Sequence, residues 1–353
     1  MPTRDETVLP ASHIPAHPGG RKHTGIRDSN LIAFIPPLGA AAYPFLLMLF
    51  HTLVGPPGSQ LTGAAILGAT LVLACTFVVP LVSLMVACRP GFRTSMRRLA
   101  YASIVAPTLY VFLGVFQALV SSPIPDPWVW CAIWLSVTLW AIRSVSDEPR
   151  PYPRSGIGRW RVAHGISAVI LCFYVLFHLA NHLVGLIGPA EHGAFMDIGR
   201  TVYRAAFIEP VLVLALLFQI ASGLYLAWQW SAAKHDFFRT FQIASGVYLS
   251  VFILGHMNSV FIYARTYLGI PTDWNFAIGA PTGLIHDPWN IRLLPHYALG
   301  VFFVLAHLIA GLRVVLNAHG VSRRIANRIW IVGVGGSALI AAAIIAGMCG
   351  IRI

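Results

Sequence analysis

Six histidines lie within strongly apolar stretches of the second half of the chain, where a polar ring needs an explanation. They are His164, His178, His182, His256, His296 and His307. A polar side chain inside a bilayer is costly unless it finds a partner. Two explanations are open. The rings can form hydrogen bonds between helices, or they can ligate a metal, for which haem iron is the usual candidate when no Asp, Glu or Cys cluster accompanies them.

Two of these histidines are matched in depth. His178 and His256 each lie a few residues outward of the middle of an apolar run. At 1.5 Å of rise per helical residue, the two rings can face each other at one level. This geometry suits a bis-histidine haem b, so we expect His178 and His256 to be the axial ligands of the iron. His307 and Gln219 share a second, deeper level, where only the imidazole is a good iron ligand.

Membrane-spanning helices must hold these side chains. The chain has 353 residues, of which 57% are hydrophobic and 10% are charged, a composition that indicates an integral membrane protein. Apolar runs of about 20 residues, long enough to cross the hydrocarbon layer as helices, predict an all-α fold with about nine spans. The runs lie near 31–54, 61–87, 98–121, 127–142, 159–187, 207–232, 238–264, 293–317 and 329–349. The run near 127–142 is short for a span.

The basic residues that give the net charge of +12 are distributed as this topology predicts. Lysines and arginines cluster before the first run and in every second connection, while the connections 55–60 and 121–127 contain none. By the positive-inside rule, the N-terminus is predicted to be cytoplasmic and the C-terminus to lie outside. We therefore expect a bacterial inner (cytoplasmic) membrane protein, surrounded by lipids, with no nucleic-acid partner.

One long polar connection divides the chain. Residues 1–30 are polar and are predicted to form a disordered cytoplasmic tail, and 31–142 to form a four-span membrane region. Residues 143–158, which are rich in Pro and Arg, form a cytoplasmic linker. The five-span part, 159–353, holds all six histidines described above.

Three stretches of this five-span part carry a family pattern. They read RVAHGISAVILCFYVLFHLANHLVG (161–185), FRTFQIASGVYLSVFILGHMN (238–258) and FFVLAHLIAGLRVV (302–315). In their spacing, residues 159–353 resemble the five-helix dihaem cytochrome b anchor subunit of succinate dehydrogenase and fumarate reductase, the succinate:quinone oxidoreductases. The N-terminal half resembles no family that we recognise. The resemblance implies electron transport with haem b and a quinone, and a cytoplasmic flavoprotein and iron–sulfur protein as partners.

The resemblance also assigns places to single residues. His164, His178, His256 and His307 stand where the family has its conserved histidines, and Ser245 belongs to a Ser/Thr-Gly step near the haem or quinone. Gln219 stands where the family has an axial histidine. The second haem, for which His307 would remain as a ligand, is therefore expected to be absent or five-coordinate. One haem is expected rather than two, and the missing haem weakens the case for succinate chemistry.

The expected quinone site lies beside the outer haem. In the family a carboxylate near the place of Glu209 accepts protons from quinol, and basic residues near the place of Arg204 can hold haem propionates. Glu209 can instead be an acidic residue that complements a helix dipole. His182, one turn beyond His178, can line a quinone pocket, bind a second metal or be an interfacial histidine. The interfacial reading is preferred for His296.

Two further features need placement. FQIASGLYL (218–226) and FQIASGVYL (241–249) are nearly identical, and we interpret both as packing units in which Ser and Gly form a close contact and Gln bonds across helices. The long outer loop 266–292 is expected to cap the outer site, with Asp273, His286 and Asp287 at its rim.

These features predict a cytochrome b-like haem domain in residues 159–353. Its activity would be that of a quinone-linked oxidoreductase subunit, and it could serve as the membrane anchor of a respiratory-type complex. The alternative is a haem-free membrane anchor or assembly protein that reuses the same fold.

Overall fold

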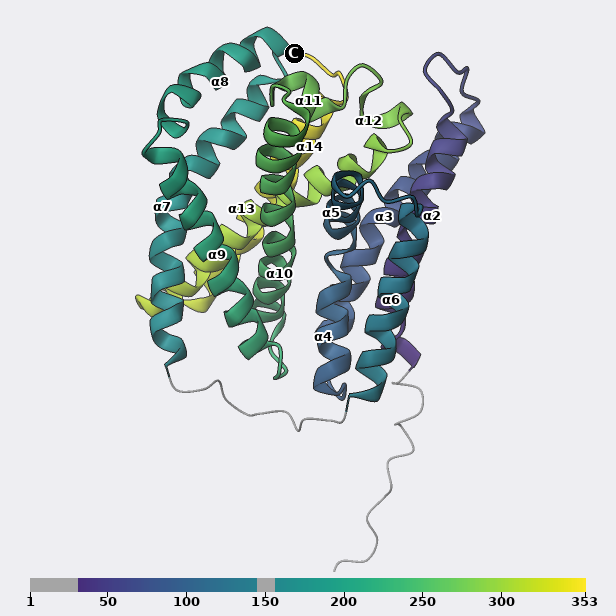
Figure 1. The fold of residues 1–353 in the computed structure, drawn as a ribbon. Helices are drawn as coiled ribbons and strands as arrows, with labels where there is room; N and C mark the ends of the chain where they lie inside the picture. The colour runs from purple at the N-terminus through teal and green to yellow at the C-terminus, as the bar shows by residue number, and fades with distance from the viewer. Residues whose placement is uncertain (1–30, 145–155) are drawn as a thin grey trace, which may run out of the picture.

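The computed structural model describes residues 31–144 and 156–353 of the protein. The predicted tail, 1–30, and most of the predicted linker, 143–158, lie outside these residues. The described chain contains helices and no strand. Figure 1 shows them as a bundle, with the C-terminus at the upper end. The predicted all-α integral membrane fold is confirmed.

The helices of the N-terminal part lie side by side along the bundle, with α4 in its lower half and α5 in its upper half (Figure 1). The predicted run 98–121 is broken into two helices that meet at an angle of 68°. Pro107 lies in the first turn of the second helix, where proline is tolerated because it has no N–H to donate, whereas it cannot continue the preceding helix. The helices are α2 (Ile35–Val54), α3 (Gly63–Ala87), α4 (Thr94–Ser103), α5 (Ala106–Leu119) and α6 (Asp126–Arg143).

The C-terminal part contains the five long helical segments that the apolar runs predict. Asp236 and Ser322 begin two of them, because each side chain accepts a hydrogen bond from a backbone N–H three residues later. The long segments are α7 (Ile157–Val184), α9 (Ile208–Trp230), α10 (Phe237–Met257) with its π-helical continuation η1 (Asn258–Leu268), α13 (Leu293–Ala318) and α14 (Arg323–Met348). The connections contain α8 (Pro189–Tyr203), α11 (Trp274–Ile278), α12 (Gly283–His286) and η2 (Asn290–Arg292).

The number of spans is lower by length and hydropathy than the nine expected. Among the described residues, seven helices are long and apolar enough to cross a membrane, and eight if the bent pair α4 and α5 counts as one span. The remaining expected span, 127–142, forms the 18-residue helix α6, which is not among those eight. It carries Asp126 and Arg143 at its two ends and Ser136 and Thr138 in its middle, which shorten its apolar stretch.

A buried ion pair joins the two parts. Arg292, in η2, lies 2.5 Å from Asp126 at the start of α6, with side-chain exposures of 8% and 17%. Gln117 of α5 donates to the same carboxylate, and the Arg292 guanidinium lies 4.4 Å from the ring centre of Tyr110. One apolar core cluster contains residues of both parts. Removing one partner of a buried pair costs about 3–5 kcal/mol, so this contact fixes how the parts pack.

Candidate functional site

His178 of α7 and His256 of α10 face each other. Their ring centres are 6.0 Å apart and the ring planes are inclined by 67°. Each imidazole stacks on the aromatic ring one helical turn earlier: Tyr174 lies 5.7 Å from His178, and Phe252 lies 5.9 Å from His256. Side chains four residues apart share a helix face, so these stacks hold the rings. The predicted match in depth is confirmed.

The separation fits two ligands of one iron. An imidazole nitrogen binds a first-row metal at about 2 Å, which places the ring centres of two opposed imidazoles about 6 Å apart. Across the described residues, no group of three or more His, Cys, Asp or Glu is arranged to hold a metal ion. A haem iron needs only two protein ligands, because the porphyrin supplies the others.

These two rings line a cavity of about 220 Å³. One water molecule needs only about 10–15 Å³, so the cavity can take a much larger group. Its walls are mostly apolar and come from α7 to α10, η1, α13 and α14, as is usual for cofactor sites. Five of the predicted site residues lie in this wall, and we call the space the histidine cavity. They are His178, His182, His256, Arg204 and Glu209.

The predicted base, Glu209, is paired with a residue that the sequence did not single out. Arg265 of η1 donates to both carboxylate oxygens of Glu209, at 2.5 and 3.3 Å. Both side chains line the cavity and keep partial exposure, 34% for Arg265 and 24% for Glu209. The pair joins η1 to the first turn of α9. Glu209 therefore has a specific partner beyond the helix dipole, which was the alternative reading.

The basic residues beside the cavity are held by the outer loop. Arg204 donates to the hydroxyl of Thr272 at 2.8 Å, and Arg200 donates to the carbonyl of the same residue at 3.0 Å. The pKa of Arg204 is lowered, chiefly by partial burial and then by the charges of Arg200 and Arg265. Neighbouring positive charges lower one another's pKa because they repel, and an anion placed beside them relieves this repulsion.

Two further histidines extend the cavity toward the upper end of the bundle. The His182 ring lies 4.7 Å from that of His178 and 5.5 Å from that of His192, which belongs to α8. The Asn181 amide nitrogen lies 3.2 Å from Nε2 of His192. Burial, followed by the charge of Arg200, lowers the pKa of His192 to about 4, although Asp273 opposes the shift. His192 was missed because it lies in a polar stretch, where hydropathy gives no signal.

His164 lies outside the cavity wall and is hydrogen-bonded through both ring nitrogens. Its Nδ1 is 2.8 Å from the Ser222 hydroxyl, and its Nε2 is 3.0 Å from the amide nitrogen of Gln219. The Ser222 hydroxyl donates to the carbonyl of Phe218, so it accepts from Nδ1, and Nε2 accepts from Gln219. In this arrangement His164 has no ring nitrogen left for a metal.

His307 has a matching serine. Its Nδ1 lies 2.9 Å from the hydroxyl of Ser245, which donates to the carbonyl of Gln242. Nδ1 therefore donates to the serine, and Nε2 keeps its lone pair. Because His164 has both ring nitrogens bonded and engages Gln219, His307 is the one imidazole at this level with a free nitrogen.

The repeated segments are now explained by these two contacts. In each copy the serine bonds the imidazole, and the glycine after it makes room for the ring. A methyl group added at Gly223 would lie 3.3 Å from Cε1 of His164, and one added at Gly246 would lie 3.2 Å from Cε1 of His307. Gln219 bonds across helices as expected, whereas Gln242 accepts from Arg239 of its own helix at 2.8 Å, so that part of the expectation was wrong.

The loop 266–292 caps the cavity only in part. Asp273 lines the cavity and also accepts from the backbone N–H of Phe276. His286 instead contacts the carbonyl of Gly55 at 3.2 Å, and Asp287 accepts from the backbone of the turn that follows it. His296, expected at the interface, is only 2% exposed. Its ring packs 4.7 Å from that of Phe252 within the bundle.

Comparisons of this chain with models of protein families, with curated proteins and with solved structures found no match. The site is therefore defined by its own geometry, in which two facing imidazoles and a paired carboxylate share one cavity.

Proposed function

We propose that the protein is a membrane cytochrome b that binds one haem b between His178 and His256 and exchanges electrons with a quinone. The observation that carries this proposal is the 6.0 Å separation of the two ring centres on the wall of a cavity that also reaches Glu209. A haem bound there would supply one-electron redox chemistry. A quinone is the natural partner, because the cavity opens among apolar membrane helices.

The residues of the chain would divide the work. His178 and His256 would ligate the iron, and Tyr174 and Phe252 would keep their rings in place. Arg204, held by Thr272, is suited to a haem propionate because a guanidinium binds a carboxylate through charge-assisted hydrogen bonds.

Glu209 would take the first of the two protons that a quinol releases as it gives up its two electrons one at a time. A base must lie within hydrogen-bond reach of the proton that it accepts, and Glu209 lines the same cavity as both histidines. Protonation would remove the carboxylate charge and weaken the hold of Arg265, so the ion pair is expected to open and close as protons pass. His182 lies between the iron ligand His178 and the upper end of the bundle, where it could carry a proton onward.

The distribution of basic residues supports an orientation in a bacterial inner membrane, with the histidine cavity toward the outside. A cytoplasmic flavoprotein and iron–sulfur protein remain proposed partners. With one haem in the outer half of the membrane, electrons from such partners would have a long gap to cross, so succinate is not proposed as the electron source.

The first test is a reduced-minus-oxidised absorption spectrum of the detergent-purified protein, with a pyridine haemochrome assay. We expect about one low-spin haem b per chain in the wild type and none in His178→Ala. His164→Ala is the matched control, because it removes a histidine of the same helix whose ring nitrogens are already hydrogen-bonded. Absence of haem from the wild type after expression with haem supplied would leave the haem-free anchor as the function.

A further inference from the structure

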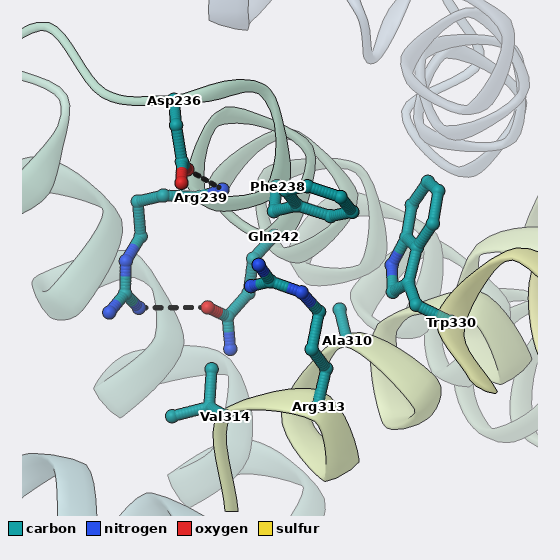
Figure 2. Close-up of a pocket in the computed structure, with 8 residues that line it drawn as sticks. All are labelled: Asp236, Phe238, Arg239, Gln242, Ala310, Arg313, Val314 and Trp330. Carbon is teal, nitrogen blue, oxygen red and sulfur yellow. Dashed lines mark hydrogen bonds between the residues drawn. The ribbon is translucent and has the colours of Figure 1, made fainter. Parts of the chain in front are cut away.

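A second pocket, of about 120 Å³, lies where α10 begins, and Figure 2 shows the residues that line it. This is the lower end of the bundle in Figure 1, whereas α8 and α11, which line the histidine cavity, lie at the upper end. The pocket is formed where the start of α10, the last turns of α13 and the first turns of α14 meet. Two arginines of different helices line it, Arg239 and Arg313, together with Gln242 and Trp330. None of these residues is used by the proposed electron transfer.

The pocket presents hydrogen-bond donors. Arg239 donates to Oε1 of Gln242 at 2.8 Å, which leaves the amide N–H groups of Gln242 directed into the space in Figure 2. Arg313 uses only its Nε, which donates to Asn327 at 2.8 Å. The indole nitrogen of Trp330 is buried without a hydrogen-bond partner, in a residue only 8% exposed. The donors that the pocket offers are therefore the remaining guanidinium N–H groups of Arg313 and the amide N–H groups of Gln242.

The charged side chains of the pocket also favour a negatively charged ligand. Arg313 lies with its guanidinium 3.8 Å from the ring centre of Phe238, which fixes its plane. Asp236 is the carboxylate in the wall, and its Oδ1 accepts from the backbone N–H of Arg239 at 2.8 Å. The ion pairs found among the described residues all involve other side chains. Two guanidinium groups therefore face one carboxylate that is already engaged as a helix cap.

We propose that this pocket binds a phosphate group, carried either by the headgroup of an anionic phospholipid or by free inorganic phosphate. Guanidinium forks match phosphate oxygens in pairs, and Arg239, Arg313 and the amide of Gln242 supply donors from two helices to such a group. The pocket lies near the helix ends where the arginines of the chain gather, which is the level of lipid phosphates on the positively charged side. Ala310 and Val314 provide an apolar wall beside it.

The test uses the full-length protein, freed of lipid in detergent, and measures thermal unfolding and native mass spectra. We expect phosphatidylglycerol to bind in preference to phosphatidylcholine and to raise the unfolding temperature by several degrees at saturating concentration. A shift given by phosphatidylglycerol alone identifies the headgroup as the source. An equal shift given by inorganic phosphate identifies free phosphate.

Variants locate the effect. Arg239→Gln and Arg313→Gln are each expected to weaken phosphate-group binding about tenfold, since one charge-assisted contact is lost. Arg324→Gln is the matched control, because Arg324 lies at the same end of α14 but does not line the pocket. Arg313→Lys keeps the charge and loses the fork, and it should bind with intermediate affinity.

Two results would overturn the proposal. One is equal binding of phosphatidylglycerol and phosphatidylcholine by the wild type, with no effect of inorganic phosphate. This measurement does not depend on the folding of any variant. The other is a loss in Arg324→Gln as large as in Arg313→Gln, which would assign the effect to general surface charge.

Discussion

Two pairs of histidines occupy the same bundle in different settings. The cavity histidines, His178 and His256, stack on aromatic rings and line an open space, with their ring centres 6.0 Å apart. The docked histidines, His164 and His307, each bond a serine and press against a glycine of the neighbouring helix. The difference shows that the role of a buried imidazole in a membrane bundle depends on whether its ring nitrogens face a cavity or are hydrogen-bonded to a neighbouring helix. A hydropathy plot presents all four as equal.

The largest expected effect is a difference in haem content between a variant of the cavity histidines and a variant of the docked histidines. His256→Ala should remove haem completely, because a single axial histidine would remain. His307→Ala should retain about one haem per chain with an unchanged spectrum, since its ring lies outside the cavity wall. The pyridine haemochrome assay measures both. If His307→Ala loses its haem while it still runs as a folded species in gel filtration, the haem binds at the level of His307 and the proposed site is wrong.

The next effect concerns the carboxylate at the cavity. Glu209→Gln keeps the size of the side chain but removes the base, and it should slow reduction of the haem by quinol about a hundredfold, as expected for general base catalysis. Stopped-flow absorption with a soluble quinol analogue measures the rate. Glu191→Gln is the control, since Glu191 lies at the same end of the bundle in α8 but outside the cavity wall. An unchanged rate in Glu209→Gln would exclude it as the base.

A smaller effect sharpens the description of the docked pair. Gly246→Ala places a methyl group 3.2 Å from the ring of His307, and the resulting overpacking should lower the free energy of unfolding by about 1 kcal/mol without changing the haem spectrum. Gly165→Ala is the control, because its added methyl meets nothing within 4 Å. Unfolding in detergent, followed by circular dichroism, compares them. Equal stability of the two variants would mean that the glycine is not needed for docking.

The smallest expected effect is on pH dependence at the edge of the cavity. The pKa of His192 falls from 6.5 to about 4 on folding, mainly through burial. The unfolded chain therefore binds more protons between these values, and stability falls as the pH drops from about 6.5 to about 4. His192→Gln should show a shallower loss of thermal stability over this window. A slope identical to that of the wild type would assign the acid sensitivity to other groups.

The sequence predicted the parts of this site that depend on a single helix. Hydropathy located the long helices, and counting residues from the helix middle placed His178 level with His256. The predicted topology also placed Glu209, Arg204 and His182 at the same end of the bundle, because all three lie near the ends of neighbouring spans. Each of these inferences needs only the rise per residue and the alternating direction of the helices.

What the sequence could not predict depends on how separate elements meet. Arg265 reaches Glu209 across 56 positions of chain, and His192 reaches the cavity because α8 folds over its upper end. The same run of residues, FQIASG, bonds across helices through Gln219 and within its own helix through Gln242. Pro107 was visible in the sequence, but nothing local fixed whether it would kink a span or begin a new helix.

The π-helix η1 begins two residues after His256, and it changes the direction in which the later side chains of this segment point. Arg265 comes nine residues after His256, which is two and a half turns of an α-helix at 3.6 residues per turn and would place the two side chains on opposite faces. A π-helix holds about 4.4 residues per turn because its hydrogen bonds reach one residue further. The same nine residues then make about two turns. The widened winding therefore turns the guanidinium back to the face of the imidazole, so that one segment supplies both the proposed iron ligand and the partner of Glu209.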